Sequence, residues 1–104
     1  MNFRLLLTAA LMFAASLTFA QRGPTYQADL AFDKGDYYDA AALYKKAFTK
    51  EKNKVKRAEV IYKVAESYRL TNDYKNQEVW YAKAIKANYK APEAILHYAD
   101  ALKM

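Results

Sequence analysis

The sequence predicts an all-α fold in which helical hairpins stack in a row, and three observations support this prediction. The chain has 104 residues but only two glycines and two prolines, so few positions interrupt a helix. Alanine is abundant, together with lysine and leucine, and these residues favour helices over strands. Two parts of the chain also match each other at a nearly constant spacing, which is typical of repeated hairpins.

Residues 1–20 have the features of a secretory signal peptide. Arg4 supplies the positive charge of the first part, and a mostly apolar run from Leu5 to Leu17 follows. Small residues around Ala20 occupy the positions that a signal peptidase reads, so we expect cleavage after Ala20. An uncleaved anchor is the alternative, but the run is short for a bilayer span, which needs about 20 residues. Residues 21–24 then form a short N-terminal segment.

Helix start and stop signals divide the remaining chain into five expected helices. Gly35 is a natural residue to end the first helix, and Asp36 is an N-cap candidate for the second. Asp73 caps the fourth in the same way, and Pro92 is acceptable in the first turn of the fifth. The expected ranges are Thr25–Lys34, Asp36–Lys50, Val55–Leu70, Tyr74–Ala87, and Pro92 to the end of the chain.

The chain contains an internal repeat. Residues 35–48 align with residues 72–85 at an offset of 37, and Ile61 aligns with Ile95 at an offset of 34. The three extra residues lie in the Lys50–Arg57 stretch. A helical hairpin cannot bury its apolar face alone, so neighbouring hairpins should stack, with aromatic side chains filling the gaps. The aromatic residues expected to pack in this way are Tyr37, Tyr44, Phe48, Tyr68, Tyr74 and Tyr81.

These motifs resemble the tetratricopeptide repeat family. Gly-Asp-Tyr at 35–37, followed by Ala40 and by Tyr-x-x-Ala-Phe at 44–48, is similar to the second helix of that repeat. The second repeat departs from the pattern, because Asn72 replaces the turn glycine and Gln77 replaces a small alanine. The resemblance implies a solenoid of about two and a half repeats. The repeats would cover residues 25–52 and 57–90, with a half repeat at 91–104, in one domain over residues 25–103.

A narrower resemblance points to the N-terminal tetratricopeptide region of OmpA-family envelope proteins of the Bacteroidetes type. It rests on the signal peptide, on Gly-Asp-Tyr-Tyr at 35–38, on Ala-Glu-Ser-Tyr-Arg-Leu at 65–70 and on Trp80-Tyr81. Some members of that group serve type IX secretion or gliding, and their tetratricopeptide region precedes a propeller-like segment and a peptidoglycan-binding domain. Neither is found in this sequence, so we expect the chain to be the front part of a longer protein.

The resemblance implies a scaffold that binds another envelope protein or a peptide, in the periplasm or at the periplasmic face of the outer membrane. An outer-membrane complex is a setting compatible with this expectation. In the family, the first helix of each hairpin lines a concave groove that holds the partner. The same positions are equally compatible with the solvated faces of amphipathic helices. Carried onto this sequence, the groove positions are Asp29, Phe32 and Asp33, then Tyr62, Glu66 and Arg69, and in the half repeat Leu96, Asp100 and Lys103.

The charge pattern gives little support to a nucleic-acid partner. The formal net charge of the chain is +6, and its densest basic run lies between Lys50 and Arg57. Basic runs can bind phosphates, but Glu51 interrupts this one, and it lies in an expected turn. We therefore interpret the run as a solvated linker and expect no nucleic-acid partner.

The sequence also lacks the residues that most enzymes need, so we expect no catalytic activity, no cofactor and no metal. It has no cysteine and a single histidine, His97. We expect His97 on the outer face of the last helix, with Glu93 and Asp100, while Ile95 and Leu102 face the second repeat. An alternative function is a tetratricopeptide-rich nutrient-uptake or glycan-uptake binding protein, although that class should carry a lipid-anchored cysteine and a longer chain.

Overall fold

The computed structural model describes residues 23–89 and 91–103, and this part of the chain forms five α-helices and no strand. The all-α class is therefore confirmed, and each helix begins and ends within two residues of its predicted range. The signal peptide predicted at residues 1–20 lies outside the described residues. No helix among those described is both long and apolar enough for a membrane span. The helices are α2 (Tyr26–Asp33), α3 (Tyr37–Lys50), α4 (Lys54–Leu70), α5 (Tyr74–Lys86) and α6 (Pro92–Leu102).

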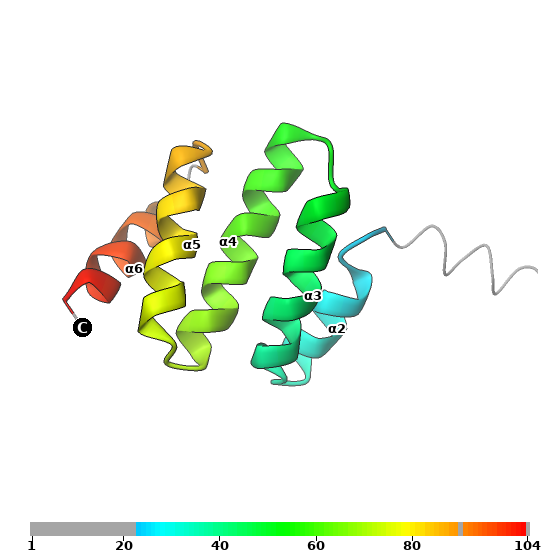
Figure 1. The fold of residues 1–104 in the computed structure, drawn as a ribbon, viewed down its shortest axis with the longest axis horizontal. Coiled ribbons are helices and arrows are strands. Elements are labelled where there is room, and N and C mark those ends of the chain that lie inside the picture. Colours follow the sequence, from blue (N-terminus) through cyan, green and yellow to red (C-terminus); the bar gives the residue numbers. More distant parts are fainter. Residues whose placement is uncertain (1–22, 90, 104) are drawn as a thin grey trace, which may run out of the picture.

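The helices form a row in which each one packs mainly against the next in sequence (Figure 1). Figure 1 shows α4 between α3 and α5, with α2 and α6 at the two ends of the row. Short turns join α2 to α3 and α4 to α5, so these pairs are antiparallel hairpins. Helix α6 packs on α5 and is the last helix of the row. This architecture is compatible with the predicted stacking of helical hairpins.

Three helices end in the same left-handed turn. Gly35 has φ of 84°, and the two asparagines at equivalent turns, Asn72 and Asn88, have φ of 59° and 60°. At the first turn the backbone N–H of Asp36 donates to the carbonyl of Ala31 at 2.9 Å, which closes the helix as a Schellman motif does. The turns at Asn72 and Asn88 repeat this bond. Asparagine tolerates the left-handed region better than other side chains, so the departure from glycine at position 72 preserves the turn.

Two apolar clusters hold the row together. In the first, Tyr44 and Val64 are almost fully buried together with small residues of α2 and α3. In the second, Tyr81 is fully buried against Ala65 and Ala94. Trp80 is half-buried and touches both clusters, with its ring 6.0 Å from the ring of Phe48 in a T-shaped contact. The alanines allow the helices to approach closely, and the aromatic rings fill the space between the hairpins.

Helix α6 is rotated relative to the sequence prediction. Ile95 and Leu102 are 62% and 55% exposed, so the prediction that they face the second repeat is wrong. The buried residues of this helix are Ala94 and Ala101. Because α5 presents the buried Gln77 and Tyr81 to this interface, α6 approaches with its smallest side chains. Tyr74 was likewise expected in the packing between helices, but it is 40% exposed.

Candidate functional site

A hollow of about 540 Å³ opens between α2 and α4, and five of the nine predicted groove residues line it. Because α2 and α4 are the first helices of successive hairpins, their side chains meet across the intervening α3. Tyr44 of α3 forms part of the floor, and Lys63 of α4 also borders the hollow. The predicted residues in the lining are Asp29, Phe32, Asp33, Tyr62 and Glu66.

Asp29 is the centre of a polar network at the edge of this hollow. Its carboxylate accepts a short hydrogen bond from the hydroxyl of Tyr44 and one of 3.2 Å from Lys63 Nζ, which also forms an ion pair with it. Thr25 Oγ1 donates to the other carboxylate oxygen at 3.2 Å. Burial raises the pKa of Asp29, but the hydrogen bonds from Tyr44, Lys63 and Thr25 outweigh it, so the net pKa lies below the ordinary value of 3.8.

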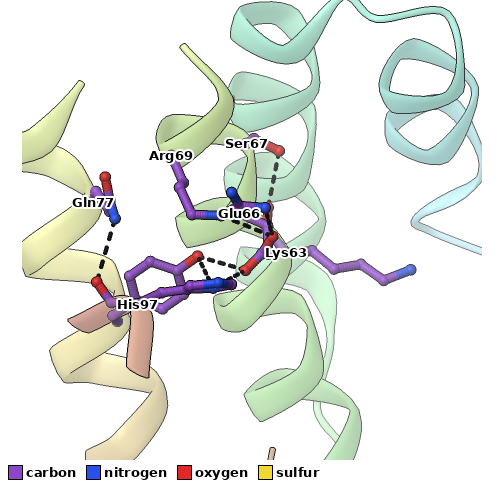
Figure 2. Close-up of polar contacts among 7 residues, drawn as sticks. Lys63, Glu66, Ser67, Arg69, Gln77 and His97 are labelled. Carbon is purple, nitrogen blue, oxygen red and sulfur yellow. Dashed lines mark hydrogen bonds and ion pairs between the residues drawn. The ribbon is translucent and has the colours of Figure 1, made fainter. Parts of the chain in front are cut away.

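Glu66 is the centre of a second network (Figure 2). Arg69 donates to Glu66 Oε2 from Nη2 at 2.8 Å and from Nε at 3.2 Å, and the Tyr81 hydroxyl donates to Oε1 at 2.5 Å. His97 Nδ1 lies 2.9 Å from the same Oε1 and 3.2 Å from the Tyr81 hydroxyl. Burial raises the pKa of Glu66, but the bonds from Arg69, Tyr81 and His97 outweigh it, and the net pKa is lowered.

The two networks occupy equivalent positions in successive repeats. In each, a carboxylate on the first helix of a hairpin accepts from a tyrosine 15 residues later on the second helix. The basic partner comes from the first helix of the following unit, at positions 63 and 97, which are equivalent by the 34-residue offset. Lys63 fills this role in the first network and His97 in the second. The internal repeat therefore extends to polar contacts as well as apolar packing.

These networks determine what the tyrosines can do chemically. Burial raises the pKa of Tyr44 and Tyr81, and the adjacent carboxylates of Asp29 and Glu66 raise it further. Burial and the charge of Glu66 raise the pKa of Tyr62 in the same way. The hydroxyls therefore stay protonated at neutral pH, and those of Tyr44 and Tyr81 serve as hydrogen-bond donors that join neighbouring helices.

The remaining predicted groove residues lie outside the hollow. Arg69 is engaged with Glu66 through two hydrogen bonds. On α6, Leu96 is 59% exposed, and Asp100 and Lys103 are also exposed. Predicted groove residues of the first two repeats therefore line one hollow. The predicted positions of the half repeat lie on a solvent-exposed face of α6.

The structure also shows residues that the sequence analysis missed or placed wrongly. His97 is half-buried against Glu66 and Tyr81, so its predicted position on the outer face of the last helix is wrong. The rotation of α6 that exposes Ile95 brings His97 inward. Lys63 and Tyr44 were not among the predicted groove residues. Tyr44 and Tyr81 are buried between helices as predicted, but their hydrogen bonds to Asp29 and Glu66 were not predicted. The repeated 15-residue spacing between a carboxylate and a tyrosine is the sequence signal that could have identified these bonds.

Within the described part of the chain, no three histidine, aspartate or glutamate side chains gather as metal ligands would. Comparison with known proteins finds no matching family model, no similar curated protein and no similar solved structure. The resemblance to tetratricopeptide repeats therefore rests on the sequence motifs.

Proposed function

We propose that this chain is an interaction module of a bacterial cell envelope protein, built as tetratricopeptide-like hairpins and without catalytic activity. Its task is to hold a segment of another envelope protein against the face formed by the first helices of the hairpins. The family resemblance and the signal-peptide pattern support this assignment to the envelope.

The hollow between α2 and α4 is the observation that carries this proposal. It lies where successive hairpins meet, and its volume of about 540 Å³ is within the range typical of ligand sites. Its lining combines the aromatic rings of Phe32 and Tyr62 with the charged groups of Asp33 and Lys63. Protein interfaces usually have a core enriched in aromatic residues and a polar rim, and this lining offers both kinds of side chain.

The aromatic walls of the hollow are held in place by other rings. The ring of Phe32 lies 5.1 Å from that of Tyr37 in a T-shaped contact, and 6.5 Å from that of Tyr44. The ring of Tyr62 is stacked on that of Tyr89 at 4.6 Å. A partner that binds here therefore meets side chains that are already ordered, which reduces the conformational entropy lost on binding.

A photo-cross-linking experiment tests the proposal. A photoreactive amino acid is placed at Asp33, on the edge of the hollow, or at the matched exposed control position Tyr38 on α3. Cross-linking is carried out in intact cells, and the captured protein is purified. We expect a partner that is captured from position 33 and not from position 38. The same set of proteins at both positions would contradict the proposal.

Purified components then test whether the hollow itself holds the partner. Tyr62→Ala removes one aromatic wall, whereas Tyr38→Ala removes an exposed ring that lies outside the hollow. We expect Tyr62→Ala to raise the Kd for the captured partner by about tenfold or more, which corresponds to about 1.4 kcal/mol. Circular dichroism confirms that both variants are folded. Equal affinities for the two variants would exclude the hollow as the binding site.

A further inference from the structure

The connection between α3 and α4 is where the repeat is interrupted. Three extra residues lengthen the spacing between the first and second repeats, and they fall in the lysine-rich stretch that ends at Arg57. In repeat proteins, insertions of this kind map to loops on one face, and that face is often the binding face. The proposed envelope function makes no use of this stretch.

Hydrogen bonds from Arg57 give this connection a defined structure. Its Nη1 donates to the carbonyls of Phe48 at 3.0 Å and Glu51 at 3.1 Å, and its guanidinium lies 3.9 Å from the centre of the Phe48 ring. The side chain of Asn53 caps α4 by accepting from the N–H of Lys56 at 3.1 Å. Arg57 therefore has a structural role, whereas the lysines of the stretch are exposed to solvent.

An apolar hollow of about 590 Å³ lies beside these lysines. The start of α4 and the end of α5 form it, and Figure 1 shows both at the same edge of the molecule. Val55 is 79% exposed, the largest exposed fraction among the large apolar residues of the described chain. Lys54 lines the hollow, and its sequence neighbours Lys52 and Lys56 are exposed. The apolar residues in the lining are Val55, Ala58, Ala87, Tyr89 and Ala91.

We propose that this edge is a second docking surface, distinct from the hollow between α2 and α4, and that it binds an acidic peptide segment with one apolar anchor side chain. The anchor enters the hollow beside Val55, and carboxylates on either side of it face Lys52, Lys54 and Lys56. Lys54 and Glu59 are the charged residues of the lining and balance each other. The lysines of the adjoining stretch outnumber its one carboxylate, Glu51, so the net charge of this edge is positive and complementary to an acidic segment.

The composition of the surface favours a peptide over a nucleic acid or a membrane. Single-stranded nucleic acids are bound by several aromatic rings on which successive bases stack, but Tyr89 is the only aromatic residue in this lining, and one of its faces is already stacked on Tyr62. Arg57 is the only arginine of the stretch, and it is held within the connection, because its Nη1 donates to two carbonyls and its guanidinium lies over the Phe48 ring. The charges that remain for a partner are those of lysines, which do not form the bidentate contacts typical of phosphate recognition by arginine. A membrane surface is broad and cannot fill a concave apolar hollow, whereas a single leucine or phenylalanine side chain can.

Fluorescence anisotropy with a labelled oligoglutamate peptide that carries one central phenylalanine tests the proposal. We expect saturable binding to the full chain that weakens with added salt, because exposed charges are screened. Replacement of the phenylalanine by alanine should weaken binding by about tenfold, the effect of losing roughly 1.4 kcal/mol of contact. Equal binding of both peptides would overturn the proposal, since it would show that charge alone is recognised.

Variants of the chain locate the site. Lys54→Glu/Lys56→Glu and, separately, Val55→Ser should each weaken binding of the phenylalanine peptide by about tenfold or more. Lys75→Glu is the matched control, since this exposed lysine lies in the first turn of α5, outside the lining of the hollow, and it should leave the affinity unchanged. An effect of Lys75→Glu as large as that of the double variant would also contradict the proposal.

Two competing probes complete the test. We expect a single-stranded oligothymidine and vesicles of phosphatidylserine to bind less tightly than the phenylalanine peptide at the same salt concentration. Tighter binding of either probe, lost in the Val55→Ser variant, would reassign the surface to that class of partner. Asp33→Ala, at the edge of the hollow between α2 and α4, should leave peptide binding unchanged, so a failure of this inference is distinguishable from a failure of the proposed envelope function.

Discussion

Tyr81 joins the two helices of the second hairpin by donating a hydrogen bond of 2.5 Å to Glu66. Tyr44 and Asp29 form the equivalent bond across the first hairpin. Both tyrosines are almost fully buried, and both carboxylates are also bound by a basic residue of the next unit. The same polar contact thus stabilises each step of the row, and it places the carboxylates beside the hollow proposed to bind a partner.

Loss of the Tyr81 hydroxyl should destabilise the fold. Tyr81→Phe keeps the buried ring but removes a donor to the half-buried carboxylate of Glu66, so we expect a loss of about 1.5–3 kcal/mol in the free energy of unfolding. Urea unfolding followed by circular dichroism measures it. The control is Tyr38→Phe, at a ring that is 71% exposed, which should change stability by less than about 0.5 kcal/mol. Equal effects of the two substitutions would show that the hydrogen bond contributes little.

Enlargement of a buried alanine should disrupt the helix packing. Ala84 is fully buried in α5, so Ala84→Leu adds volume where no space exists, and we expect a loss of about 1–3 kcal/mol. Ala42 is an exposed alanine of α3, and Ala42→Leu should leave the stability nearly unchanged. Thermal melts of both variants provide the comparison. A tolerated leucine at position 84 would mean that α5 can move away from its neighbours.

The turn at Asn72 offers a test of backbone conformation. Its φ of 59° is unfavourable for alanine, so Asn72→Ala should destabilise the protein by about 1 kcal/mol. Asn72→Gly should retain the stability, because glycine adopts the left-handed region at no steric cost and already does so at Gly35. Urea midpoints measure the difference. If the alanine and glycine variants unfold at the same midpoint, the left-handed turn does not limit stability.

The carboxylates of Asp29 and Glu66 should make the fold sensitive to acid. Burial opposes ionisation of both groups, but their hydrogen bonds prevail and the folded pKa values lie below the ordinary 3.8 and 4.5. A group whose pKa is lowered by folding contributes stability above its unfolded pKa and loses it as the pH falls through the folded pKa. We therefore expect full stability from these groups near neutral pH and a progressive loss below about pH 4.

Urea midpoints measured from pH 7 to pH 3 test this acid sensitivity. Glu66→Gln removes the titrating group, so the variant should be less stable than the parent chain at pH 7 and should lose less stability on acidification. Glu78→Gln is a matched control on an exposed residue of α5 and should retain the parental pH dependence. A Glu66→Gln variant with an unchanged pH profile would assign the acid sensitivity to other groups.

Local signals in the sequence account for the helices and for much of the candidate site. Gly35 and Asn72 mark the ends of α2 and α4 through their tolerance of positive φ, and Asp73 caps α5 by accepting from the N–H of Asn76. The family resemblance placed Asp29 and Glu66 among the groove positions, and the structure brings both to one hollow. Such features depend on contacts a few residues apart or on the repeat itself, so the sequence is sufficient to predict them.

Contacts that depend on the rotation of a helix were not predictable in the same way. The pattern of α6 offers apolar residues on more than one face, and Ile95 and Leu102 are intrinsically better core residues than Ala94. The bulk of Gln77 and Tyr81 on α5 decides which face turns inward. Gln77 also donates from Nε2 to the carbonyl of His97 at 3.3 Å, a bond that a sequence pattern does not reveal.

The sequence by itself determined the five helices, their turns and the repeated order of small and aromatic residues, because each follows from local conformational preference or from periodic burial. Only the tertiary structure decided which charges meet. Lys63 reaches Asp29 and His97 reaches Glu66 across 34 and 31 residues, respectively. The packing of one hairpin on the next brings these distant residues into contact. That packing depends on the fit of large and small side chains between the helices.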